Sequence, residues 1–109
     1  MDARLPAHLE IAALRRAAEA AGGFATVLRK GERDSGTVLV VLSESGGNQR
    51  LYERMPSLDG GRVWQLSMSQ DTDNPNIFTD YLTRRGTQDP DLWIVELDIV
   101  DGERLIALL

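Results

Sequence analysis

The segment TVLVVLS at residues 37–43 constrains the fold of this chain more than any other stretch. Five consecutive apolar residues, Val38 to Leu42, leave neither face of an extended strand polar. Such a strand belongs inside a sheet and has to be covered on at least one side by a helix. The segment DLWIVELDIV at 91–100 is also apolar on both faces near its middle, which predicts a second interior strand.

Two amphipathic segments are predicted to be helices that cover these strands. Residues 7–21 are rich in strong helix formers. Their apolar members recur at spacings of three and four and form one stripe: Ala7, Ile11, Leu14, Ala18 and Ala21. Gly22–Gly23 is predicted to end this helix. The second helix is predicted to begin at Pro75, with Asn74 as its N-cap, and to end at Gly86.

Four strands are expected between the two helices, at residues 24–30, 37–43, 50–55 and 63–68. Short turns separate them, so we predict an antiparallel meander. The Asp101–Gly102 pair favours a final hairpin, and a short helix over residues 103–109 is the alternative. The fold class is therefore predicted as a single α+β domain over residues 1–109, with a mostly antiparallel mixed sheet packed by helices.

Composition excludes several classes of protein. The chain has 109 residues and no cysteine, so disulfides, zinc–thiolate sites and thiol nucleophiles are ruled out. No apolar run is long enough to span a bilayer, and no basic region leads into an apolar block, so a cytoplasmic protein without a membrane span is expected. The net charge of −5, with basic residues only in scattered pairs, does not favour nucleic acid as a partner.

The stretch GERDSGT at residues 31–37 has the outline of a phosphate-binding loop. Such a loop needs a lysine before its hydroxyl residue and a helix that begins there. Here Gly36 precedes Thr37, and a strand-like segment follows. We therefore predict a hairpin tip between strands 24–30 and 37–43, because Gly, Asp and Ser are typical turn residues.

The single histidine and the two tryptophans do not indicate a catalytic centre or a cofactor site. His8 is the only histidine and has no visible nucleophile beside it, and one histidine without cysteine does not make a zinc site. Trp64 and Trp93 are flanked by aliphatic residues at strand spacing, so both are predicted to lie in the core. We expect no bound cofactor.

The best-supported role is interaction with a protein or binding of a small anionic ligand. Basic residues cluster around the first predicted hairpin, and further basic residues share a face with one tyrosine two strands along. The candidate binding residues are Arg29, Lys30, Arg33, Arg50, Tyr52 and Arg54. The alternative for this set is a solvated surface with acidic neighbours.

Two other functions stay open. Strand alternation places Glu96 and Asp98 on one face, and with Asp91 they could bind Mg²⁺ in a metal-dependent hydrolase. The order of elements is similar to the core of the restriction-endonuclease-like nucleases, but Asp98 stands where those have a lysine. The third function is assembly through an open sheet edge, so that the chain is a monomer or a homodimer.

Several segments together resemble a known family over nearly the whole chain. They are RLP at 4–6, ALRR at 13–16, the block FATVLRKGERDSGTVLVV, LYER, and DPDLWIVELD. In their order and spacing the chain resembles an uncharacterised family of short bacterial proteins, the domain of unknown function 1491. An aspartate is commoner in that family where Glu32 stands. The resemblance implies a compact bacterial cytosolic protein and carries over no activity, cofactor or site residue.

Overall fold

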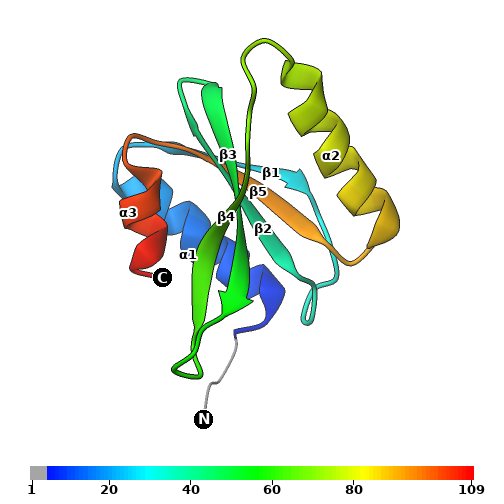
Figure 1. Cartoon of the computed structure of the whole chain (residues 1–109). Helices are drawn as coiled ribbons and strands as arrows, with labels where there is room; N and C mark the ends of the chain where they lie inside the picture. Colours follow the sequence, from blue (N-terminus) through cyan, green and yellow to red (C-terminus); the bar gives the residue numbers. More distant parts are fainter. Residues whose placement is uncertain (1–4) are drawn as a thin grey trace.

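The computed structural model describes residues 5–109 as three helices and one five-stranded sheet (Figure 1). The helices are α1 (Ala7–Ala20), α2 (Pro75–Gln88) and α3 (Gly102–Ala107). The strands are β1 (Phe24–Arg29), β2 (Val38–Glu44), β3 (Gly47–Pro56), β4 (Arg62–Ser69) and β5 (Trp93–Asp98). The predicted α+β class is confirmed. Residues 1–4 of the predicted domain lie outside the described residues.

The sheet has the order β1-β5-β2-β3-β4. Strands β2, β3 and β4 form the predicted antiparallel meander. Strand β1 does not join this meander, because β5 lies between β1 and β2, antiparallel to the first and parallel to the second. The physical reason is burial: β5 is apolar on both faces, so it occupies a central position. Residues 31–37 therefore form a connecting loop across β5, and the prediction of a hairpin tip is wrong.

Helices cover both faces of the sheet (Figure 1). Helices α1 and α3 pack on one face, against alternate residues of the central strands such as Val40 and Val95. Helix α2 packs on the other face, where Phe78 contacts the cluster that includes Val41 and Ile94. The alternation of side chains along each strand separates these two cores.

The predicted helix boundaries are partly right. The stripe of α1 is buried at Ala7, Ile11, Leu14 and Ala18. The helix ends before Gly22, which has a φ of +92°, as a glycine stop requires. Helix α2 begins at Pro75 as predicted but continues past Gly86, which is buried against the Arg29 side chain. Gly86 therefore serves close packing, and the prediction that it ends the helix is wrong.

The last residues form helix α3, so the alternative to a final strand is the correct one. Asp101 adopts a left-handed φ of +58°, the conformation that a tight turn requires. Gly102 is buried against Leu42, where an added Cβ would lie 2.8 Å from a Leu42 methyl carbon. The Asp101–Gly102 pair therefore makes a sharp turn from β5 into a helix packed on the sheet.

Candidate functional site

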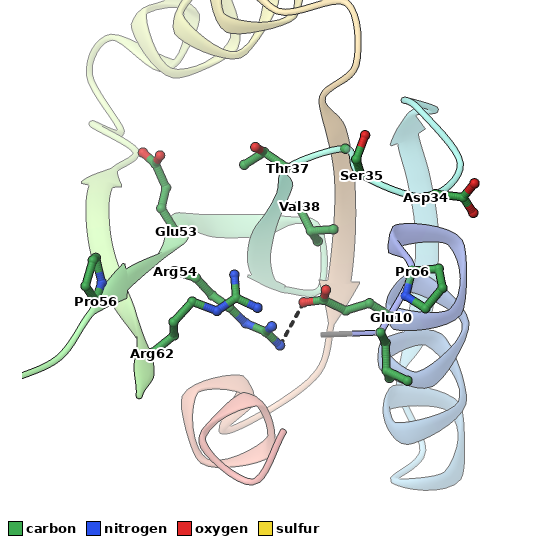
Figure 2. A pocket seen from close by; sticks show the side chains of 12 residues that line it. Pro6, Glu10, Asp34, Ser35, Thr37, Val38, Glu53, Arg54, Pro56 and Arg62 are labelled. Atoms are coloured by element: carbon green, nitrogen blue, oxygen red, sulfur yellow. Dashed lines mark ion pairs between the residues drawn. The ribbon is translucent and has the colours of Figure 1, made fainter. Parts of the chain in front are cut away.

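A hollow lies where the start of α1 and the 31–37 loop face β3 and β4 (Figure 2). We call it the loop cavity. Its volume is about 540 Å³, in the range of small-molecule sites. Its walls are polar and apolar in about equal measure: Leu5, Pro6, Glu10, Asp34, Ser35, Gly36, Thr37, Val38, Glu53, Arg54, Pro56 and Arg62.

The 31–37 loop is fixed in place by its own side chains and by α1. The Glu32 carboxylate accepts hydrogen bonds from the backbone N–H groups of Asp34 and Ser35, at 2.8 and 2.5 Å. These bonds, the Ser35 one foremost, hold the pKa of Glu32 below its usual value. The first N–H groups of α1 donate to the loop carbonyls of Asp34 and Arg33. The loop thus replaces the side-chain cap that Pro6 cannot supply at the start of α1.

A second cavity of about 470 Å³ adjoins the first, between β3, β4 and α3. We call it the α3 cavity. The side chains of Arg54 and Arg62 line both cavities. The other residues around the α3 cavity are Tyr52, Gly61, Val63, Trp64, Glu103, Ile106, Ala107 and Leu109. We call the loop cavity and the α3 cavity together the arginine cleft.

Arg54 is positioned from two sides. Its Nη2 lies 2.7 Å from Oε1 of Glu10 on α1, and the two side chains are only 19% and 13% exposed. Its guanidinium also stacks over the ring of Trp64, 4.5 Å from the ring centroid. Trp64 is therefore half-buried against the core and also forms a wall of the cleft, rather than lying wholly in the core as predicted.

Three carboxylates around the cleft each have an arginine partner. The pairs are Glu10 with Arg54 at 2.7 Å, Glu53 with Arg85 at 2.9 Å, and Glu103 with Arg50 at 2.6 Å. Asp34 lies at the rim with its side chain largely in water. Arg62 forms no ion pair with any residue in the described part of the chain. Arg62 is thus the cleft's uncompensated cation within residues 5–109.

The Glu103 carboxylate ties α3 to the sheet. It accepts hydrogen bonds from Nε and Nη2 of Arg50, at 2.6 and 3.0 Å, and from the Tyr52 hydroxyl at 3.0 Å. The Arg50 hydrogen bond is the main reason why the pKa of Glu103 lies below its usual value. Burial, followed by the bond to Glu103, raises the pKa of Tyr52. Arg50 and Tyr52 therefore position α3 and one wall of the cleft.

The structure brings together half of the predicted binding residues. Arg50, Tyr52 and Arg54 alternate along β3 and share the face covered by α1 and α3. Arg29 lies on the other face, against Gly86 of α2. Lys30 and Arg33 are exposed near or within the 31–37 loop, outside the residues that line the cleft. Whether any of the six binds a ligand stays a prediction.

The sequence reasoning missed Arg62. The sequence pattern that identifies Arg62 is strand alternation: Arg62 and Trp64 stand two residues apart, on the same face of β4. Their register with Pro56 and Arg54 of β3 puts them beside the predicted binding residues. The predicted strand begins at Val63, one residue after the observed start of β4, and so does not include Arg62.

The predicted metal-binding carboxylates lie in two places. Glu96 accepts hydrogen bonds from Ser43 and Gln49, and Asp98 accepts two from the turn after β2. Asp91 lies before the other end of β5. Within residues 5–109, no three or more His, Asp or Glu side chains come close enough to hold a metal ion. The metal-dependent hydrolase stays a prediction that no feature of this arrangement favours.

Fold and cleft together define a class: a small α+β protein with helices on both faces of a mixed sheet and a ligand-sized cleft at one end. The chain matches the family described as "Protein of unknown function (DUF1491)" over residues 5–107, and it belongs to that family. The predicted resemblance is confirmed. A comparison with curated proteins gives no match.

Solved structures of similar proteins support the fold. A crystal structure of a DUF1491 family protein from Caulobacter crescentus CB15 has 36% sequence identity and a TM-score of 0.77, and the match covers 94% of each chain. An NMR structure of a family protein from the same organism has 34% identity, with 96% and 94% of the chains covered and the same TM-score of 0.77. A solution structure of a protein from A. tumefaciens has 26% identity and a TM-score of 0.73, with 96% and 94% covered.

Among the residues described, no helix is long and apolar enough to cross a bilayer.

Proposed function

We propose that this protein binds a small anionic ligand in the arginine cleft and acts by binding rather than by catalysis. The observation that carries the proposal is Arg62: it lines both cavities and has no ion-pair partner among the described residues. A guanidinium in such a hollow favours carboxylate or phosphate, which accept its hydrogen bonds in a bidentate manner. Arg54 adds a second guanidinium to the cleft. Its side chain is already held by Glu10 and Trp64, so it does not have to rearrange when a ligand binds.

The state of the carboxylates supports binding over catalysis. Glu10, Glu53 and Glu103 are held in ion pairs. Burial alone would raise the pKa of Glu53, but hydrogen bonds from Arg85 and Ser67 outweigh it and lower that pKa. Glu103 is likewise held with a lowered pKa. Carboxylates of this kind are poor proton donors near neutral pH.

A titration with inorganic phosphate tests the proposal. We expect saturable chemical-shift changes at the backbone amides of the cleft at low ionic strength, and about a tenfold weaker affinity in Arg62→Gln, since a charged hydrogen bond contributes about 1.5–3 kcal/mol. The measurement is an NMR titration of ¹⁵N-labelled protein. Arg84→Gln, at an exposed position of α2, is the matched control and should bind as the wild type does. Equal affinity of Arg62→Gln and wild type would contradict the proposal.

Assembly through a sheet edge is the second candidate function. In the described chain β4 pairs only with β3, so its other edge is open, and the strand carries the half-exposed Val63 and Leu66. An unpaired edge of this kind is a template for a strand of a second copy. A homodimer formed in this way predicts that β4 gains protection from hydrogen exchange as the protein concentration rises.

The compartment belongs to the proposal as well. We place the protein in the cytoplasm because the chain contains no cysteine, which fits a reducing compartment. The partner is a small anion rather than nucleic acid, since the net charge of −5 repels a polyanion while one local arginine can still bind a single anionic group.

A further inference from the structure

The α3 cavity places a requirement on the ligand that a bare anion does not meet. It adjoins the loop cavity at Arg62, and its volume of about 470 Å³ would hold a small organic molecule. Its walls away from the arginines are largely apolar, formed by Trp64, Val63, Ile106 and Leu109. A phosphate or sulfate ion at Arg62 would leave these walls facing water.

Two of these wall residues are about half exposed to solvent. Val63 is 51% exposed and Leu109 is 50% exposed, whereas Ile106, which lines the same cavity, is buried. Trp64 has Arg54 stacked over its ring, so its position is fixed before any ligand arrives. A fixed aromatic ring beside half-exposed aliphatic side chains favours a flat apolar group. Burial of apolar surface is the main source of affinity for such a group.

The charges around the α3 cavity fix where the anionic end must lie. Glu103 is the acidic side chain among the described residues that line this cavity, and it is already paired with Arg50 and Tyr52. Arg62 supplies the uncompensated positive charge of the described cleft and sits at the junction of the two cavities. The anionic end therefore belongs at Arg62 and the apolar end beside Trp64.

Building on the proposed function, we infer that the ligand is an amphipathic small molecule: one carboxylate or phosphate group bound by Arg62, joined to a flat apolar body that fills the α3 cavity. The shared chemistry is an anionic head on an aromatic or similarly flat group. Such a molecule matches both the charge of Arg62 and the apolar walls of α3 and β4.

The experiment compares three probes: 1-naphthyl phosphate, inorganic phosphate and 1-naphthol. The two tryptophans report the binding site, since Trp64 lines the cavity while the Nε1 of Trp93 donates to the Glu32 carbonyl at 2.6 Å, away from it. We expect 1-naphthyl phosphate to bind at least about tenfold more tightly than phosphate, because burial of a naphthyl face against apolar walls supplies more than this factor. It should shift the indole N–H signal of Trp64 and leave that of Trp93 unchanged.

Matched variants separate the head from the body. Arg62→Gln should weaken both phosphate and 1-naphthyl phosphate. Leu109→Ser combined with Val63→Thr should weaken 1-naphthyl phosphate about fivefold or more, through lost apolar contact, and leave phosphate unchanged. Leu108→Ser is the control, since Leu108 is 82% exposed and does not line the cavity.

These results test the amphipathic ligand separately from the proposed anion-binding function. If 1-naphthyl phosphate binds no more tightly than phosphate, or if the double variant binds it as well as the wild type, the amphipathic ligand is refuted and the anion site stands. If Arg62→Gln leaves phosphate binding intact, the proposed function fails as well. Binding of 1-naphthol as tight as that of 1-naphthyl phosphate, or a shift of Trp93 instead of Trp64, also overturns the inference.

Discussion

The glycines of the 31–37 loop illustrate how one backbone atom can dictate residue type. A Cβ at Gly31 would lie 2.1 Å from the carbonyl oxygen of Asp91, and one at Gly36 would lie 2.3 Å from the same atom. The Glu32 N–H donates to that carbonyl at 2.9 Å, so the two segments are held together. The glycine spacing that resembles a phosphate-binding loop therefore comes from the close approach of two chain segments.

We expect Gly31→Ala to lower the free energy of unfolding by about 2 kcal/mol, in the range of overpacked sites. The contact is with backbone, which cannot move aside as a flexible side chain would. Urea denaturation gives the value. Gly61→Ala is the matched control: its nearest contact would be 3.5 Å, to a side chain, so the change should stay within about 0.5 kcal/mol. A Gly31→Ala variant as stable as Gly61→Ala would show that the loop shifts freely.

At the scale of elements, local sequence predicts well whether a segment is a helix or a strand. It predicts poorly which segments pack or pair with one another. Both long helices and all five strands follow from apolar periodicity and from Pro and Gly signals. Asp101–Gly102 signals a sharp turn, but the choice of helix over strand depends on packing against Leu42 and on the Glu103 bonds to β3. Neither contact can be read from neighbours in the sequence.

The same limit applies to the candidate site. Arg50, Tyr52 and Arg54 were found because they alternate within a single strand. Arg62 joins them only through the register of β3 with β4. Arg29 was grouped with them because the first two strands were expected to be neighbours, whereas β5 separates those strands. Strand order is a property of the whole sheet, so a site that spans strands depends on it.

Helix α3 is predicted to depend on the charge of Glu103. We expect Glu103→Gln to lower the free energy of unfolding at pH 7 by about 1 kcal/mol, a low value because the side chain is 42% exposed. The folded pKa lies below the usual 4.5, so this stabilisation is present above that pH and is lost as pH falls through the folded pKa. The difference between wild type and variant should therefore shrink toward pH 3 in urea denaturation.

The control for this prediction is Glu19→Gln, a carboxylate exposed on α1 without an ion pair among the residues described. It should change the free energy of unfolding little at either pH. A Glu103→Gln effect of equal size at pH 3 and pH 7 would mean that the carboxylate charge does not hold α3.

At the scale of the whole molecule, the cleft joins the two ends of the described chain. Its walls come from α1 and the 31–37 loop on one side and from α3 on the other, with β3 and β4 between them. Strand β5, which arrives late in the chain, completes the centre of the sheet beside β2. The cleft therefore exists only when the complete fold has formed, and its ligand should stabilise the whole domain by binding the native state alone.

Hydrogen exchange tests this architecture and the open edge together. Amides in β2 and β5 should exchange only through global unfolding, because both strands are flanked on each side by other strands. The β4 amides that do not pair with β3 should exchange about a thousandfold faster or more, through local opening. Protection of these β4 amides that grows with protein concentration would identify a homodimer formed through this edge. Equal protection of β4 and β5 in dilute protein would contradict an open edge at β4.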